Sequence, residues 1–391
     1  MSKRKPLCYA PWIATYEYST GDIVPCCEWN EGMRTVKTDE HMSMEDRFNH
    51  PVMQEIKDEL LTSKTLPPEC HNCVQFEKHG GKSMRNIFDE IVEEEERKDW
   101  EFDEDKFKLL FMDYRESNLC NFSCMMCGAD ISSTIAKIEG MHDKKTGILK
   151  NPHKLQMYLD RLDEVNLVNF LGGEPMLTES MWIVLKELRR RELHHGMRVS
   201  IVTNGSLLHR NEDHLMPLLE GFKFVDISVS IDCIGKAHNY WRSKNSWKQV
   251  EANCKELYKW KQGKHNVNCA IRTAIGWPNS FAAKDVFDKF KDMDIQNKWN
   301  LISHPEGLAI TNLPQDDIDK LVEHWKDYPD VQQVFMNTKS KPNILGMNSE
   351  IIKLSKIEKT RDIKFGDAFP DTVHLYNKLV DPKNNSYFDS N

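Results

Sequence analysis

The chain has 391 residues, a formal charge of −8 and 39% hydrophobic residues, which describes an ordinary globular protein with room for two or three domains. Its 53 Lys and Arg residues are fewer than its 61 Asp and Glu residues, so a main role in neutralising nucleic-acid phosphates is not expected. No apolar run approaches the roughly 20 residues of a membrane-spanning helix. The basic start Lys3-Arg4-Lys5 has no apolar segment after it, so we expect a cytoplasmic protein without a secretory signal.

Residues 1–100 look irregular and end in a polar helix, with the glutamates of positions 93–96 expected on a solvated face. Eleven cysteines are many for a chain without a secretory signal, and their uneven placement favours metal binding over disulfides. Eight of them form two sets: Cys8, Cys26, Cys27, Cys70 and Cys73, then Cys120, Cys124 and Cys127. The remaining three, Cys233, Cys254 and Cys269, are expected to be small buried hydrophobes.

From about residue 107 onward, segments with the patterns of strands and helices alternate. Strands are predicted at residues 108–114, 165–171, 199–202, 224–231, 267–275 and 299–303. Helices are predicted at residues 131–138, 179–191, 211–219, 246–260 and 281–290. Because each helix returns the chain to start the next strand in the same direction, the pattern predicts an α/β fold with a parallel sheet, in the form of a partial (β/α)6 barrel of the TIM type.

We expect this barrel at residues 101–310, between a cysteine-bearing module at residues 1–100 and a helical extension at residues 311–391. In such barrels the loops that follow the strands gather at one face, where active sites lie. The first of these loops contains Cys120, Cys124 and Cys127 in a C-x3-C-x2-C pattern.

Three thiolates can bind three irons of a four-iron four-sulfur cluster and leave the fourth iron open. Zinc is the alternative, and it would require a fourth Cys or His to complete its tetrahedron. The nearest histidine, His142, lies beyond the next predicted helix, so a local fourth ligand is awkward to supply.

This loop resembles the signature of the radical S-adenosylmethionine (radical SAM) superfamily. Met126 stands where that family usually has an aromatic residue, and a methionine can also pack against an adenine ring. Further segments resemble the family's motifs in the same order: Gly172-Gly173-Glu174-Pro175, Thr203-Asn204-Gly205, Ser228-Val229-Ser230-Ile231-Asp232, and Arg242. The resemblance covers residues from about 107 to about 306.

The resemblance implies a 4Fe-4S cluster on Cys120, Cys124 and Cys127, with SAM on the open iron. It implies that Glu174 meets the SAM amino group and that Ser230 and Arg242 meet the carboxylate. The other expected cofactor-binding residues are Met126, Gly172, Gly173, Asn204 and Asp232. A flavodoxin- or ferredoxin-type reductant would supply an electron, SAM would be cleaved, and the resulting 5′-deoxyadenosyl radical would abstract hydrogen from a substrate. No catalytic side chain is assigned beyond this cofactor site.

The cysteines before residue 100 can supply four further ligands. Cys8, Gly21 and Cys26 form a C-x12-G-x4-C opening, and Cys70 and Cys73 a C-x2-C pair, with Cys27 able to replace Cys26. Zinc fits this set as well as iron does. The opening resembles the SPASM or twitch elements of radical SAM proteins, which usually follow the barrel, whereas this one precedes it. That resemblance implies a second 4Fe-4S cluster without an open iron, suited to electron transfer or to support of the fold.

Proteins with SPASM or twitch elements often modify peptides or proteins, so a peptide or protein substrate is expected first. A small molecule such as a sugar or nucleoside is the alternative among enzymes. A non-catalytic metal-binding interaction protein is the alternative outside them, and the presence of Glu174 and Arg242 argues against it. The basic run at residues 189–191 is better explained as the end of a helix than as a nucleic-acid contact.

Overall fold

The computed structural model describes residues 5–18, 21–30, 34–37, 42–78, 80–141, 152–244, 246–359 and 361–380. Lys3, Arg4 and His142, which entered the sequence analysis, lie outside these residues. The chain divides into two compact units. Unit 1 comprises Met1–Leu119, Asp143–Ile201 and His209–Val225, and unit 2 comprises Cys120–His142, Val202–Leu208 and Asp226–Asn391. Within the described ranges, no helix has both the length and the apolar character needed to cross a bilayer.

Parallel strands form the sheet of each unit, which confirms the predicted α/β class. In unit 1 the strand order is β6-β5-β3-β1-β2, and all neighbours but the last pair are parallel. These strands are β1 (Ala14–Glu17), β2 (Ile23–Val24), β3 (Phe111–Arg115), β5 (Leu167–Leu171) and β6 (Arg198–Thr203). In unit 2 the order is β12-β11-β9. These strands are β9 (Phe224–Ser230), β11 (Val267–Ile275) and β12 (Gln296–Leu301), and β11 and β12 are parallel.

Helices alternate with these strands, as the periodicity predicted. They are α6 (Ser133–Ile138), α7 (Pro152–Leu159), α8 (Glu179–Arg190), α9 (Leu215–Leu219), α10 (Gly235–Trp241), α11 (Trp247–Lys261) and α12 (Lys284–Phe290). The apolar residues Trp182, Leu185 and Leu188, at helical spacing on α8, are all buried. Between β6 and α9, a small hairpin pairs β7 (His209–Arg210) with β8 (Asp213–His214).

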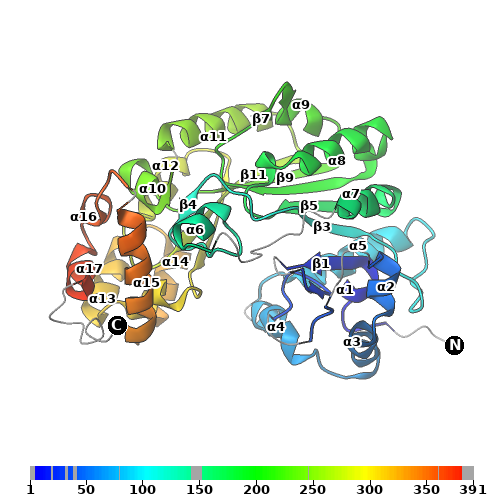
Figure 1. Cartoon of the computed structure of the whole chain (residues 1–391), viewed down its shortest axis with the longest axis horizontal. Coiled ribbons are helices and arrows are strands. Elements are labelled where there is room, and N and C mark those ends of the chain that lie inside the picture. Colours follow the sequence, from blue (N-terminus) through cyan, green and yellow to red (C-terminus); the bar gives the residue numbers. More distant parts are fainter. Residues whose placement is uncertain are drawn as a thin grey trace. The chain divides into compact units, whose positions relative to one another are not determined.

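Residues 1–100 are more regular than expected. Helices α1 (Ala10–Ile13), α2 (Met44–Asn49), α3 (Pro51–Thr62), α4 (His71–Lys78) and α5 (Met84–Glu96) gather around β1, as Figure 1 shows in blue to cyan. Strand β1 extends the parallel sheet through its pairing with β3. The prediction of an irregular segment was therefore wrong. Helix α3 buries Met53, Ile56 and Leu60 at helical spacing, which the sequence reading overlooked, and the four-residue β1 is too short to reveal an alternating pattern.

The glutamate run at the end of α5 is not uniformly solvated. Glu95 is buried, and its carboxylate pairs with Lys98 and Lys108 and accepts a hydrogen bond from the Asn166 side chain. The predicted solvated face was wrong for this residue, because two of its partners, Lys108 and Asn166, lie beyond the helix and no helical pattern shows them.

The described part of residues 311–391 is helical, as predicted. Its helices are α13 (Gln315–His324), α14 (Pro329–Asn337), α15 (Ile344–Glu358), α16 (Phe365–Ala368) and α17 (Val373–Val380), drawn from yellow to red in Figure 1. Within unit 2, α15 packs against α17, and α16 packs against α10. The buried side chains of Trp325 and Phe365 contribute to this core. The domain boundaries near residues 100 and 310 stay predictions.

Candidate metal and cofactor site

The three cysteines of the C-x3-C-x2-C pattern lie in unit 2, on the loop that follows β3. A two-residue strand in this loop, β4 (Ser123–Cys124), pairs with β10 (Arg242–Ser243), and Cys124 lies directly opposite Arg242. The Cys127 thiol is hydrogen-bonded to the Cys124 sulfur. The Cys120 sulfur lies 3.9 Å from the Asn204 side-chain nitrogen. The β4–β10 pairing and the Asn204 contact thus hold this loop at two of its cysteines, Cys124 and Cys120.

Arg242 brings a buried positive charge to this loop. Its Nε donates to the Asp232 carboxylate at 2.7 Å, and its Nη1 lies 3.8 Å from the Cys124 sulfur. Asp232 is fully buried and also accepts a hydrogen bond from the Ala274 backbone N–H at 2.8 Å. The hydrogen bond from Cys127 and the charge of Arg242 together lower the pKa of the Cys124 thiol. The buried cation thus lies where it would stabilise a Cys124 thiolate, which is the form that binds metals.

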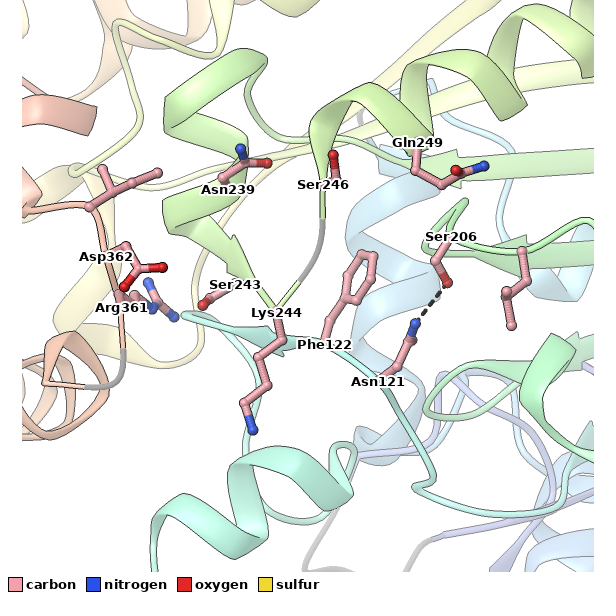
Figure 2. Close-up of a pocket in the computed structure, with 12 residues that line it drawn as sticks. Asn121, Phe122, Ser206, Asn239, Ser243, Lys244, Ser246, Gln249, Arg361 and Asp362 are labelled. Carbon is pink, nitrogen blue, oxygen red and sulfur yellow. Dashed lines mark hydrogen bonds between the residues drawn. The ribbon is translucent and has the colours of Figure 1, made fainter.

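The loop after β6 also contacts the cysteine loop within unit 2. The Asn204 side chain donates to the Asn121 side-chain oxygen at 2.9 Å, and the Asn121 amide donates to the Ser206 hydroxyl at 3.0 Å (Figure 2). Ser230 is the last residue of β9, two positions before Asp232. The structure thus brings Asn204 and Asp232 to the segments that carry or contact the cysteines.

The Gly172-Gly173-Glu174 turn lies in unit 1 and binds the chain just before the cysteine loop. The Gly173 N–H donates to the Ser117 carbonyl at 3.0 Å, and the Glu174 N–H donates to the Leu119 carbonyl at 2.8 Å. Gly172 has a φ of +125°, a conformation that other residues rarely adopt. Glu174 is fully buried, and one carboxylate oxygen accepts a hydrogen bond from the Met176 N–H at 3.2 Å. The two glycines let this turn approach the backbone that leads into Cys120.

Replacing Gly173 by alanine tests that close approach. A Cβ at this position would lie 2.4 Å from the Leu119 carbonyl oxygen, so the backbone must shift. We expect a loss of about 1–3 kcal/mol in the free energy of unfolding, as for other overpacked sites. Urea denaturation of Gly173→Ala and of Gly196→Ala measures the difference, because a Cβ at Gly196 would meet nothing within 4 Å. Equal stability of the two variants would contradict the expectation.

Four N-terminal cysteines are neighbours within unit 1. Burial raises the pKa of Cys8, and nearby Cys70 and Cys73 raise it further. Burial also raises the pKa of Cys26 well above its usual value, with smaller contributions from Cys27, Cys8 and Cys70. For Cys70, burial and the neighbouring Cys73 raise the thiol pKa to about 12. The segments around α1, β2 and α4 therefore place Cys8, Cys26, Cys70 and Cys73 close enough together for neighbouring thiols in this set to affect one another's pKa.

Cys27 has a different neighbourhood from Cys26. Burial raises its pKa first, and the next largest influence is the carboxylate of Asp113 on β3, followed by Glu28 and Arg115. Burial in turn raises the pKa of Asp113 to about 6. Cys27 thus lies toward β3, whereas Cys26 lies among the other thiols.

The residues present fit iron–sulfur clusters in their donor chemistry. Buried thiols are costly to ionise unless a cation replaces the proton, and both cysteine sets offer several soft donors together. In the described ranges, no three Cys, His, Asp or Glu side chains are already arranged at metal-binding distances. The fit therefore rests on the grouping of the thiols and on the buried cation beside Cys124.

Comparison with known proteins agrees with the motif pattern. Residues 116–268 match the family model described as the radical SAM superfamily. The matched stretch begins just before the cysteine loop and ends in β11. No curated protein matches the sequence.

Solved structures that match the chain include two proteins recorded with SAM and with peptides. The chain is similar to anSMEcpe, solved with bound AdoMet, with 22% identity and a TM-score of 0.40 over 62% of this chain and 66% of that chain. It therefore spans just under two thirds of the length of anSMEcpe. It is also similar to Streptococcus suis SuiB bound to the precursor peptide SuiA, with 14% identity and a TM-score of 0.35 over 85% of this chain and 71% of that chain.

Sequence reasoning missed three residues at the cysteine loop. Asn121 is part of the loop and bonds to Ser206, and Lys353 and Arg361 donate to the loop's backbone. Lys353 and Arg361 lie beyond the matched residues, and no local pattern marks either of them. Arg361 also lines a cavity of about 650 Å³, together with Asn121 and Phe122 of the cysteine loop (Figure 2).

A buried histidine on α10, His238, predicts a dependence of stability on pH. Burial, together with the charge of Arg242, lowers the pKa of His238 to about 3. As pH falls below the usual value of about 6.5, the unfolded chain binds a proton that the folded chain does not. The contribution of the neutral His238 to the free energy of unfolding is therefore complete above about pH 6.5. It declines by about 1.4 kcal/mol per pH unit below that pH.

Urea unfolding between about pH 5 and about pH 7 measures this decline. We expect the His238→Gln variant to have a shallower dependence than the wild type in this range. The exposed His265 offers a control, and His265→Gln should retain the wild-type dependence. An unchanged slope in His238→Gln would contradict the assignment.

Proposed function

We propose that the protein is a radical SAM enzyme that acts on a peptide or protein. The observation that carries this proposal is the placement of a buried Arg242–Asp232 pair against Cys124, within a loop that holds two further cysteines. Three thiols and an adjacent cation suit an anionic cluster that leaves one iron for SAM. When bound, such a cluster would supply an open iron and the electron that releases a 5′-deoxyadenosyl radical from SAM, for hydrogen abstraction from the substrate.

In this proposal the chain's own residues hold and orient the cofactors. Cys120, Cys124 and Cys127 are the cluster ligands. The resemblance to the family suggests that Glu174 binds the SAM amino group and that Ser230 and Arg242 serve its carboxylate. Met126, Asn204, Gly172, Gly173 and Asp232 complete the set of cofactor-binding residues. The buried Asp232 fixes the Arg242 side chain, which preorganises the cation before either ligand arrives.

A peptide or protein substrate is proposed because the N-terminal cysteine set resembles elements found in enzymes that modify peptides. A small molecule such as a sugar or nucleoside remains the second candidate. The electron donor is proposed to be a flavodoxin- or ferredoxin-type protein.

Production of 5′-deoxyadenosine tests the proposed reaction. The full-length chain would be reconstituted anaerobically with iron and sulfide, then incubated with dithionite and SAM. We expect 5′-deoxyadenosine to accumulate, together with methionine. If neither product forms in iron-loaded protein, the enzyme proposal fails.

We also propose a second 4Fe-4S cluster in the N-terminal module, on Cys8, Cys26, Cys70 and Cys73. The proposal favours Cys26 over Cys27 because Cys8 and Cys70 are among the largest influences on the pKa of Cys26, whereas Asp113 and Glu28 are the largest charged influences on Cys27. Four protein ligands would leave no open iron, so the role would be electron transfer or support of the fold.

The metal content of Cys70→Ala distinguishes iron from zinc at these ligands. We expect this variant to lose about half of the wild-type iron, because one of two clusters would lose a ligand. Plasma mass spectrometry of wild type, Cys70→Ala and Cys27→Ala would give the answer, with Cys27→Ala retaining wild-type iron. Loss of zinc without loss of iron in Cys70→Ala would show that the N-terminal site binds zinc.

A further inference from the structure

Two cations of the C-terminal extension are hydrogen-bonded to the backbone of the cysteine loop, all within unit 2. Lys353, on α15, donates from Nζ to the Cys127 carbonyl at 2.7 Å. Arg361, shortly after α15, donates from Nη2 to the Ser123 carbonyl at 2.8 Å. Ser123 directly precedes Cys124, so both bonds fall on or next to expected cluster ligands.

Arg361 is a buried cation whose partners are almost entirely backbone carbonyls. Its side chain is only 8% exposed, and its Nη1 donates to the Tyr240 carbonyl. Its Nε has no hydrogen-bond partner, and no ion pair involving Arg361 is found among the described residues. Burying such a charge is costly unless a negative group lies near it. Glu358 is one negative group near Arg361, and the Cys124 thiol, which also acts on the pKa of Arg361, is a second once it is deprotonated.

Lys353 is partly balanced by acidic neighbours. Its Nζ lies 3.8 Å from a Glu139 carboxylate oxygen and 3.9 Å from a Glu350 carboxylate oxygen. Both distances exceed that of an ordinary hydrogen bond, whereas the bond to the Cys127 carbonyl does not. The strongest directed contact of Lys353 is therefore the one to the loop.

One side of the loop borders a cavity, which makes these bonds structurally important. Asn121 and Phe122 line the cavity of about 650 Å³ that Arg361 also borders (Figure 2). The guanidinium of Arg361 joins Ser123 and Tyr240 at this wall. A loop that faces open space on one side depends on such bonds to keep one conformation.

We propose that Lys353 and Arg361 are positioning residues that hold the cysteine loop and raise the reduction potential of the cluster bound there. The inference rests on the proposed function, because it requires a cluster on Cys120, Cys124 and Cys127. The potentials of iron–sulfur clusters depend on nearby charge, on hydrogen bonds and on solvent exposure. Positive charge beside the ligands favours the reduced state, which carries one more electron. The C-terminal extension would thereby make the transfer of an electron to the cluster more favourable.

The test compares Lys353→Gln and Arg361→Gln with Lys356→Gln in the full-length reconstituted protein. Lys356 is exposed on the same helix, three residues from Lys353. Iron content is measured first, and the potential is then determined by redox titration of the electron paramagnetic resonance signal that changes on SAM addition. We expect the ratio of reduced to oxidised cluster at a fixed potential to fall about tenfold in the first two variants, which is about 59 mV for one electron.

Further results distinguish a failure of this inference from a failure of the proposed function. Arg361→Lys should recover part of the Arg361→Gln shift, and Lys356→Gln should titrate as the wild type does. Iron-loaded Lys353→Gln with the wild-type potential would overturn the inference and leave the proposed function intact, even if Arg361→Gln does not fold. A wild-type protein without a SAM-responsive signal would contradict both the inference about Lys353 and Arg361 and the proposed function.

Discussion

Replacing Cys124 by alanine should abolish the formation of 5′-deoxyadenosine. Cys124 is buried between Cys127 and Arg242, so its loss removes a cluster ligand and leaves the cation without its thiolate. We expect the rate to fall by more than about 100-fold, which exceeds the 10–100-fold typical of losing an outer-shell partner. Product formation is measured by chromatography after anaerobic reconstitution, and iron content is measured on the same sample.

Cys254→Ala is the matched control for this prediction. Cys254 is buried on α11 and belongs to neither cysteine set. Its substitution should leave iron content and product formation near wild type. Equal product formation in Cys124→Ala and Cys254→Ala would show that Cys124 is not a ligand.

Replacing Arg242 by methionine should destabilise the fold as well as the site. The substitution leaves the fully buried Asp232 carboxylate without its cation. Breaking one side of a buried ion pair typically costs about 3–5 kcal/mol, and urea denaturation measures the loss. The double variant Arg242→Met/Asp232→Asn should recover much of it, because no unpaired charge remains.

Arg272→Met serves as the control for the Arg242 prediction, because the Arg272 side chain is exposed. We expect its free energy of unfolding to stay within about 0.5 kcal/mol of wild type. A single Arg242→Met variant as stable as Arg272→Met would contradict a buried, energetically coupled pair.

The periodic part of the fold could be predicted from the sequence. Strand β11 and helix α8 each carry enough residues to show a pattern, and the structure has both near the predicted positions. Strand β1 has four residues and pairs with β3 about 100 positions away, so no local pattern reveals it. Burial of Glu95 was missed for a related reason, because it depends on Lys108 and Asn166.

In the candidate site, too, local motifs could be predicted and contacts between distant residues could not. The cysteine loop and the glycine turn are short, contiguous motifs, so their residue types and spacing identify them. Lys353 and Arg361 reach the loop across 226 and 238 residues, respectively, and only the folded chain brings them there. Cys26 and Cys27 are alike in sequence, but in the structure Asp113 is the largest charged influence on the pKa of Cys27, whereas Cys8 and Cys70 are among those on Cys26.

The central claim is that Cys120, Cys124 and Cys127 hold a cluster with an iron open to SAM. Electron–nuclear double resonance of the reduced protein, with SAM labelled with ¹⁵N at its amino group, tests this most directly. The account predicts a hyperfine coupling from the labelled nitrogen in the wild type and none in Cys124→Ala. An iron-loaded, reduced wild-type protein without that coupling would contradict it.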